Sequence, residues 1–495
     1  MELIYNPYLP LYEYVPDGEP HVFGDRLYIY GSHDVSGGRN YCEDHYTVWS
    51  APINNLKDWH CHGVSYRRNQ DPSNADDSRT LYAPDAVQGP DGRYYLYYCF
   101  SFLPEIGVAV SDSPAGPFEY YGHVKYPAQI NDGRVLHEHM PFDPAVLVDE
   151  DKRVYLYYGF APGGEKHIEV PDPDSEEMKF LPEADKDAMR KLRNMVPEKY
   201  SRAAELESDM ITLKAEPAPL IPSEDYADGT SFKGHGFFEA SSIRKIKGKY
   251  YFVYSSHKSH ELCYAVSDSP ISGYTYGGTL VSNGDIGLNG RQTPVYPLGN
   301  NHGGLVQVGD DFYVFYHRQT NGTEFSRQGC AEKVYLAEDG SIAQAEITSC
   351  GLNGAPLPAS GIYPAGICCH LTDPTVRNRI DYRDPVMNAQ VCVTQKQNQV
   401  FITRIKDQTM VGYKYFDLQE PSSVLLELRG DFCGRVSISL DEAGEQEIGT
   451  GELQSSGDSW KLHRIPVRKC SGTQALYIAF SGEGSLDMRS LGFFK

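Results

Sequence analysis

The segment RYYLYYC, residues 93–99, represents a strand pattern that occurs five times in this 495-residue chain. Each copy is rich in Tyr, Phe and β-branched or Leu residues, and a turn signal such as PDG or VGD precedes it. A short apolar strand lies ahead of each turn, so the sequence predicts five β-hairpins. The other copies are RLYIYGS from Arg26, RVYLYYG from Arg153, KYYFVYS from Lys249 and DFYVFYH from Asp311.

A third strand follows three of these hairpins, as YTVWSAP from Tyr46, GVAVSDSP from Gly107 and CYAVSDSP from Cys263. Antiparallel units of this kind, repeated about every sixty residues, are typical of propeller blades. The pattern predicts a five-bladed β-propeller over residues 1–350, and the simpler alternative is a β-sandwich with coincidental internal similarity. The interval between the third and fourth copies is the longest, and we expect it to hold an insertion over about 162–234. The charged, helix-compatible sequence of this insertion indicates a surface excursion or a lid.

The sequence changes character beyond a Gly/Pro-rich stretch that begins at Gly351. Alternating strands such as QVFITRI and RVSISLD follow, and no helical period interrupts them. We therefore expect a jelly-roll-like β-sandwich accessory domain over residues 366–495, and an all-β fold for the whole chain.

Composition excludes several classes of function. The formal net charge of −22 repels phosphate backbones, so nucleic acid is not an expected partner. No signal peptide is recognised and no stretch approaches a membrane-spanning length, so neither export nor a membrane partner is predicted. The 11 cysteines lack a CxxC pair, which argues against a disulfide framework or a zinc site and favours the cytoplasm. The sequence does not indicate an oligomeric state.

The first strand of each propeller blade lines the central axis, so residues near the starts of these strands converge. Carboxylates are costly to bury beside apolar residues without partners. Glycosidic cleavage needs two carboxyl groups, a protonated acid for the leaving oxygen and an ionised base or nucleophile on the opposite face of the sugar. Four acidic residues and one histidine near the strand starts therefore point to a sugar-cleaving site, although other propellers bind metals or proteins at this rim. These residues are Glu19, Asp85, Asp143, Glu239 and His302.

The blade sequences resemble family 43 glycoside hydrolases in order and spacing. They read GEPHVFGDRLYIYGSHD, LYAPDAVQGPDGRYYLYY, FDPAVLVDEDKRVYLYYG, FFEASSIRKIKGKYYFVYSS and NHGGLVQVGDDFYVFYH. The resemblance implies an inverting exo-enzyme that cleaves terminal xylosyl or arabinofuranosyl residues from plant-polysaccharide-derived oligosaccharides. No cofactor is required for this chemistry, and inversion requires base and acid to lie roughly 6.5–9.5 Å apart.

The resemblance also implies roles for three carboxylates. Glu19 takes the position of the general base, Asp143 that of the carboxylate that orients the acid and tunes its pKa, and Glu239 that of the general acid. The family usually has Asp where this chain has Glu19, so Asp17 and Asp34 are alternative bases.

The remaining candidates have supporting roles. We expect Asp85 to contact a sugar hydroxyl or to support its neighbours, and Asp34 and Arg291 to bind substrate, with a surface position as the alternative for Arg291. His302 resembles the family's axial histidine, which implies either a structural calcium site or a hydrogen-bonded structural residue. The C-terminal region resembles a family 6-like carbohydrate-binding sandwich, in which Trp460 is the only Trp. A structural role for this region stays open.

Other functions also stay open. An exo-galactan-acting hydrolase would differ mainly in its pocket loops. A glycoside phosphorylase would need a basic cluster for phosphate, and no such cluster is evident. A non-catalytic sugar-binding propeller is suggested by the Glu at position 19. A retaining fructan-acting propeller is disfavoured, because its Asn-Asp-Pro segment is absent from the first blade.

Overall fold

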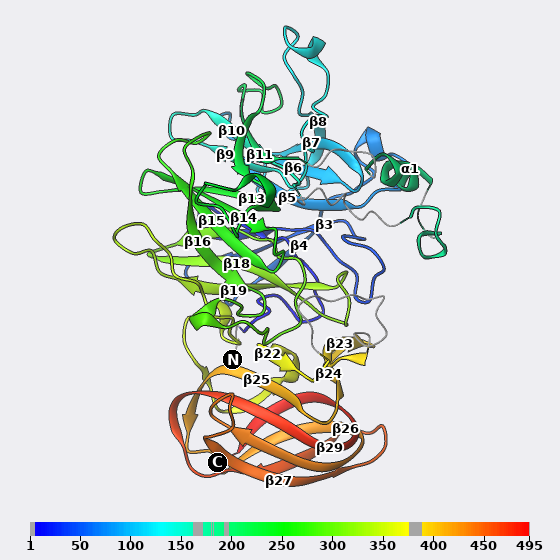
Figure 1. Cartoon of the computed structure of the whole chain (residues 1–495), viewed down its shortest axis with the longest axis vertical. Coiled ribbons are helices and arrows are strands. Elements are labelled where there is room, and N and C mark those ends of the chain that lie inside the picture. Colours follow the sequence, from blue (N-terminus) through cyan, green and yellow to red (C-terminus); the bar gives the residue numbers. More distant parts are fainter. Residues whose placement is uncertain are drawn as a thin grey trace.

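The chain forms two lobes stacked along its long axis, and the C-terminal strands, orange and red in Figure 1, form the lower lobe. Almost all regular structure is β, as the sequence predicts. No helix among the described residues is long and apolar enough to cross a membrane. The computed structural model describes residues 5–161, 172–179, 181, 183–192, 198–375 and 389–494.

Five antiparallel sheets follow one another along the chain, and in each of them consecutive strands pair. The first two contain β1 (Glu19–Phe23), β2 (Arg26–Tyr30), β3 (Tyr46–Pro52) and β4 (His60–Tyr66), then β5 (Leu81–Gln88), β6 (Tyr94–Phe100), β7 (Leu103–Ser111) and β8 (Glu119–His123). The next two contain β9 (Ala145–Val148), β10 (Val154–Tyr158), β11 (Tyr200–Leu206) and β12 (Ala218–Pro222), then β13 (Phe237–Ile246), β14 (Lys249–Ser256), β15 (Glu261–Ser267) and β16 (Thr275–Ser282). The fifth contains β17 (Leu305–Val308), β18 (Asp311–Gln319) and β19 (Arg327–Val334).

The five sheets close into a ring. The innermost strands β1, β5, β9, β13 and β17 contact one another in this order, and β17 returns to contact β1. This closure confirms the predicted five-bladed propeller, and it brings the starts of all five strands to one axis.

The Tyr-rich second strands are buried because each blade is covered on both faces by its neighbours. In β6, every residue after Tyr94 is buried, so its sequence is a continuous aromatic run without polar alternation. Two hydroxyl groups of β6 find partners inside the core: Tyr97 donates to the carbonyl of Met210 at 2.6 Å, and Tyr98 to Asp71 Oδ2 at 2.6 Å. Tyr97 and Tyr98 therefore contribute buried apolar area without leaving their hydroxyl groups unsatisfied.

The expected insertion over 162–234 is shorter than the sequence indicated. Strands β11 and β12 lie within this range and complete the third blade, so only its first part is an excursion. That part contains the helix α1 (Glu183–Leu192), while residues 162–171, 180, 182 and 193–197 lie outside the described residues. Short 3-10 helices occur at Pro72–Asn74, Asn131–Gly133, Glu176–Met178, Glu224–Tyr226, Leu288–Gly290, Gly351–Asn353 and Ala365–Ile367.

Among the described residues of the lower lobe, ten strands are connected in one network of β-pairing. Its two long strands β26 and β29 pair along the length of β26, and curled strands of this kind carry the alternating pattern read from the sequence. The strands are β20 (Leu357–Pro358), β21 (Gly361–Pro364), β22 (His370–Thr372), β23 (Cys392–Lys396), β24 (Gln399–Ile405), β25 (Thr409–Gln419), β26 (Ser423–Ser439), β27 (Glu447–Ser455), β28 (Lys461–Pro466) and β29 (Ser471–Phe494).

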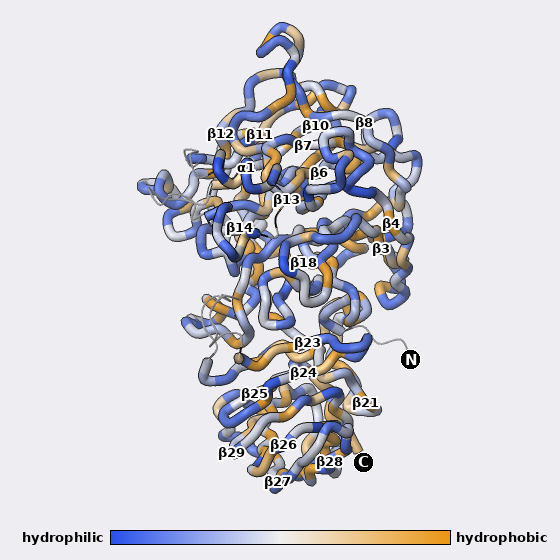
Figure 2. The backbone as a smooth tube through the Cα atoms, turned by 90° about the vertical axis from the view of Figure 1, so that its right-hand side faces the viewer, coloured by the Kyte–Doolittle hydropathy of each residue, from blue (hydrophilic) through white to orange (hydrophobic). Residues whose placement is uncertain are grey.

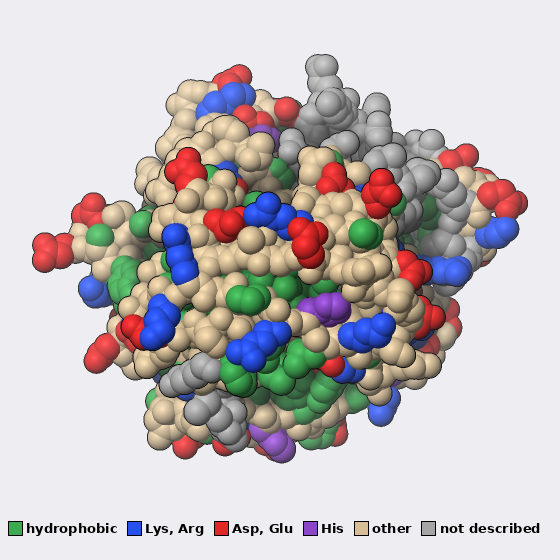
Figure 3. Space-filling model, turned by 90° about the horizontal axis from the view of Figure 1, so that it is seen from below, with side chains coloured by type: hydrophobic (Ala, Val, Ile, Leu, Met, Phe, Trp, Pro, Cys, Tyr) green, Lys and Arg blue, Asp and Glu red, His purple; other side chains and the backbone are tan. Residues whose placement is uncertain are grey.

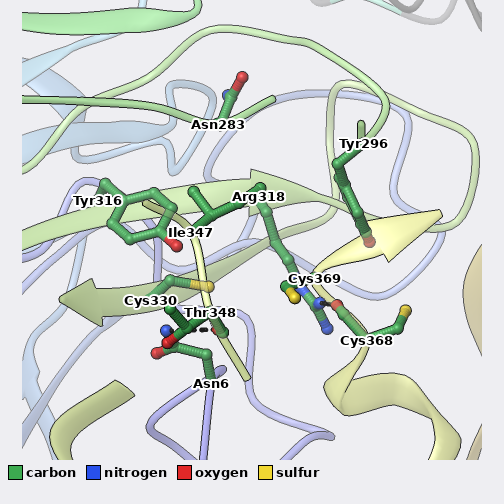
Figure 4. Close-up of a pocket in the computed structure, with 10 residues that line it drawn as sticks. All are labelled: Asn6, Asn283, Tyr296, Tyr316, Arg318, Cys330, Ile347, Thr348, Cys368 and Cys369. Carbon is green, nitrogen blue, oxygen red and sulfur yellow. Dashed lines mark hydrogen bonds between the residues drawn. The ribbon is translucent and has the colours of Figure 1, made fainter. Parts of the chain in front are cut away.

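The two lobes share one hydrophobic core, which joins residues of blades four and five to the C-terminal strands. Hydrophobic segments lie along strands of both lobes in Figure 2. At the junction, Arg318 of β18 donates to the carbonyl of Cys368 at 2.6 Å and lies over the ring of Tyr296. These residues line a cavity close in size to one water molecule (Figure 4). The face seen from below in Figure 3 mixes acidic and basic side chains.

Candidate active site

The predicted axial residues do converge, but they belong to two separate clusters. Glu19 begins β1 and Asp85 lies in β5, whereas Asp143 and His302 lie just ahead of β9 and β17. Glu239 is the third residue of β13. One cluster gathers around Asp143 and includes Asp17, and the other gathers around Glu19.

Asp143 is the centre of the first cluster. Its Oδ2 accepts a hydrogen bond from the backbone N–H of Ala240 at 3.0 Å, directly after Glu239. Burial raises the pKa of Asp143 well above its ordinary value, and the negative charges of Glu239 and Asp17 raise this pKa further. The charges of the three carboxyl groups therefore interact across blades one, three and four.

Asp17 is buried but is held in its ionised form. Arg327 Nη1 donates to Asp17 Oδ1 at 2.9 Å, and His317 Nδ1 lies 3.3 Å from the same oxygen. Burial alone would raise the pKa of Asp17, but the charges of Arg327 and His317, with a further contribution from His302, hold this pKa well below its ordinary value. Asp17 thus presents a carboxylate to the axis at neutral pH.

Asp34 positions the guanidinium that holds Asp17. Arg327 Nε donates to Asp34 Oδ2 at 2.8 Å, and Nη2 donates to Oδ1 at 3.0 Å. Oδ1 also accepts the backbone N–H of Cys42, and the side chain of Asp34 is buried. Both oxygens are engaged, so the expected substrate contact through Asp34 is not supported.

Glu19 lies in the second cluster, and its surroundings do not suit a base. Its Oε2 accepts from Arg244 Nη2 at 2.8 Å and from Ser242 Oγ at 3.1 Å, and only 1% of the residue is exposed. Burial raises the pKa of Glu19 to about 8, although Arg244 opposes this shift. The site is also closely packed, because a Cβ at Gly304 would lie 2.6 Å from Oε2. A buried carboxyl group whose oxygen is already bound by a guanidinium and a hydroxyl is a poor acceptor for a proton from water.

Asp85 supports its neighbours, which was one of the two roles expected of it. His21 Nε2 lies 2.6 Å from Asp85 Oδ1, and the backbone N–H groups of Ala86 and Val146 donate to Asp85 Oδ1 and Oδ2 at 2.7 and 2.8 Å. The residue is fully buried. These contacts connect blades one, two and three, so the structure does not support a direct sugar contact for Asp85.

The residues around His302 do not fit a protein-ligated calcium ion. Its Nδ1 lies 3.6 Å from Asp143 Oδ2, and burial together with the charges of His317 and Arg327 lowers the pKa of His302 to about 4. Calcium takes 6–8 oxygen ligands. Among the described residues, two groups of three metal-ligating side chains occur, and neither contains His302. Of these, the group with Glu19 already holds the cationic guanidinium of Arg244.

Arg291 and Trp460 make contacts other than those expected of sugar-binding residues. Arg291 Nη1 donates to Glu442 Oε1 at 3.0 Å, so this side chain connects the propeller to the C-terminal lobe. The structure therefore does not support the expected pocket contact of Arg291. The guanidinium groups of Arg429 and Arg489 lie 4.4 and 4.9 Å from the ring centroid of Trp460, where a sugar would otherwise stack.

Sequence reasoning did not identify Arg327, His317 or Arg244 as parts of the site. All three lie on second or third strands or farther along an innermost strand, away from the strand starts that the repeat pattern highlights. A buried carboxylate requires a nearby cation, but the sequence has no local signal that assigns a particular Arg to a particular Asp.

Paired carboxyl groups at the axis of a five-bladed propeller, one of them held ionised, define a glycoside-hydrolase type of site. The family model described as glycosyl hydrolases family 43 matches residues 10–342. This chain is 42% identical over 495 residues to a xylosidase/arabinosidase of Thermoclostridium stercorarium, with 98% of each chain covered. It is 33% identical over 330 residues to a xylosidase/arabinosidase of Bacteroides ovatus, and the aligned region covers 63% of this chain and 87% of that one.

A solved structure agrees with these sequence relationships. The GH43_1 enzyme from Xanthomonas citri, complexed with xylose, matches with 28% identity and a TM-score of 0.50, covering 72% of this chain and 96% of that one. The chain belongs to glycoside hydrolase family 43. It is therefore a glycoside hydrolase.

Proposed function

We propose that this enzyme removes terminal xylosyl or arabinofuranosyl residues from short oligosaccharides derived from plant polysaccharides, with inversion at the anomeric carbon. The full-length relative from Thermoclostridium stercorarium is described as a xylosidase/arabinosidase, and the Xanthomonas citri enzyme has been crystallised with xylose and with xylotriose. The observation that carries the mechanism is the electrostatic coupling of Asp143 to both Asp17 and Glu239.

In this mechanism Asp17, not Glu19, is the general base. The positive charge of Arg327 keeps Asp17 ionised, so its carboxylate accepts a proton from the attacking water. The water oxygen forms a bond to the anomeric carbon while the glycosidic bond breaks. Glu239 donates its proton to the departing glycosidic oxygen, so one displacement inverts the configuration.

Asp143 positions the general acid Glu239 and favours its protonated form. Its hydrogen bond to the N–H of Ala240 holds the backbone beside Glu239, and the two carboxyl groups repel each other when both are ionised. Closely placed carboxyl groups retain a shared proton to a higher pH than either would alone. This supports an Asp143–Glu239 pair that keeps a proton to a higher pH than an isolated carboxyl group would.

The proposal is tested with a panel of 4-nitrophenyl glycosides, including β-xyloside, α-L-arabinofuranoside and β-galactoside, and with xylo- and arabino-oligosaccharides. Cleavage of the first or second aryl glycoside is expected, with single sugars released from oligosaccharide ends. Proton NMR of the first product should show the inverted anomer. Exclusive galactoside cleavage, internal cleavage or a retained anomer would each contradict the corresponding part of the proposal.

A further inference from the structure

A second group of metal-ligating side chains lies on blade four, apart from the axial carboxylates. It consists of His235, Glu261 and Cys263, which we call the blade-four cluster. One ligand atom from each residue lies within 4.8 Å of those of the other two. Glu261 and Cys263 are buried, and 27% of the His235 side chain is exposed. The cluster is therefore open to solvent on one side only.

The distances in the blade-four cluster suit zinc after a small movement. In a tetrahedral zinc site, the imidazole nitrogen lies about 3.6 Å from a thiolate sulfur and about 3.4 Å from a carboxylate oxygen. His235 Nδ1 lies 3.8 Å from Cys263 Sγ and 2.7 Å from Glu261 Oε1. The nitrogen–oxygen distance must open by roughly 0.7 Å, and the partly exposed His235 ring can provide this shift. The sulfur lies within 4.8 Å of the Glu261 oxygen.

Outer contacts already hold the three ligands in place. Ser256 Oγ donates to Glu261 Oε1 at 2.6 Å, and Thr279 Oγ1 donates to Oε2 at 3.3 Å. The ring of Tyr276 stacks on His235 with centroids 4.6 Å apart. Partners of this kind fix ligand orientation in metal sites, so the cluster does not depend on three free side chains meeting by chance.

A cationic side chain marks the position where a metal would enter. Lys258 Nζ lies 3.4 Å from Glu261 Oε1 and 3.5 Å from His235 Nδ1, and 37% of the Lys258 side chain is exposed. The ammonium group compensates the buried carboxylate of Glu261. Because Lys258 is long and partly exposed, it can swing into solvent and leave its place to a cation of higher charge.

We propose that the blade-four cluster binds one Zn²⁺ ion through His235 Nδ1, a Glu261 oxygen and Cys263 Sγ, with water as the fourth ligand. A mixed imidazole, carboxylate and thiolate set favours zinc over calcium or magnesium. On binding, the Cys263 thiol loses its proton to solvent and forms the sulfur–zinc bond. Since His235 lies four residues ahead of Glu239, the ion would fix the segment that leads into the strand carrying the proposed acid.

The test uses Co²⁺ and Zn²⁺ with the purified full chain, initially stripped with a chelator. Co²⁺ bound to a thiolate gives a near-ultraviolet charge-transfer band, which carboxylates and imidazoles do not give. The exposed pair His60 and His62 on β4 has ring centroids 4.7 Å apart and could chelate a metal by itself. All titrations therefore use a His60→Ala, His62→Ala background.

One Co²⁺ per chain with the thiolate band is expected, and Zn²⁺ should displace it. Cys263→Ser should abolish the band and weaken Zn²⁺ binding by roughly 10–100-fold, a loss that even an outer partner of a ligand can cause. Cys433→Ser, at an exposed free cysteine, is the matched control and should leave the band intact. Lys258→Met should tighten binding, because the competing ammonium is removed.

The absence of a band at millimolar Co²⁺, or a band that persists in Cys263→Ser, would overturn the proposal. Should Cys263→Ser fail to fold, His235→Ala provides the second variant, since this side chain is partly exposed. Unchanged Zn²⁺ affinity in that variant would equally refute the site. The readout is metal binding, so the result is independent of which glycoside the enzyme cleaves.

Discussion

Replacing Asp17 by Asn separates the two candidate bases of the first blade. The substitution keeps the size of the side chain and removes only its negative charge and proton-accepting capacity. Arg327 keeps its two side-chain hydrogen bonds to Asp34 and remains in place. We therefore expect a folded enzyme, destabilised by about 1.5–3 kcal/mol for the lost charged hydrogen bond.

The expected kinetic effect is large. General base catalysis contributes roughly 10²–10⁴-fold, so kcat/KM should fall by this factor. The corresponding rise in the activation barrier is about 3–5 kcal/mol. Glu19→Gln is the matched control: the amide oxygen can still accept from Arg244 and Ser242, so activity should change only a few-fold while stability falls.

The assay is hydrolysis of a 4-nitrophenyl glycoside, with thermal unfolding followed by circular dichroism as the control for folding. A nitrophenolate leaving group needs little help from an acid, so loss of the base remains fully visible in the rate. A folded Asp17→Asn enzyme with near-normal kcat, together with an inactive Glu19→Gln enzyme, would refute the assignment of Asp17 and restore Glu19.

Three further predictions concern Glu239, Arg291 and His123. Glu239→Gln should slow oligosaccharide hydrolysis far more than 4-nitrophenyl glycoside hydrolysis, and an equal loss on both would contradict its role as acid. Arg291→Met should reduce the free energy of unfolding by less than about 1 kcal/mol, because its pair with Glu442 is partly exposed, and leave KM unchanged; a raised KM would indicate a pocket contact instead. His123 Nε2 lies 2.8 Å from Asp71 Oδ2, and its Nδ1 lies 2.7 Å from Glu105 Oε2. Burial lowers the pKa of His123, but these two carboxylates outweigh this and raise it to about 9. Its stabilising contribution is complete below pH of about 6.5 and is lost as pH rises through about 9, so His123→Gln should flatten stability against pH in this window, as measured by urea unfolding.

Several features of this protein follow from local sequence alone. Five copies of one Tyr-rich hairpin predict five blades, because strand and turn preferences act over a few residues and the repeats share a common spacing. The same pattern places Asp143 and Glu239 near the starts of innermost strands. The fourth strand of most blades and the two blade-three strands inside 162–234 are weaker signals, since short edge strands have little distinctive composition.

Only the tertiary structure distinguished Asp17 from Glu19. The two residues are neighbours in the first blade, yet Asp17 meets Arg327, 310 residues away, while Glu19 meets Arg244, 225 residues away. Whether a buried carboxyl group is ionised depends on such distant charges and on desolvation. The zinc ligands proposed on blade four illustrate the same limit, because the chain spacing of His235, Glu261 and Cys263 matches no short motif. Local sequence determines which strands form. Closure of the propeller ring determines which charged side chains lie in contact, and the chemistry of the site depends on those contacts.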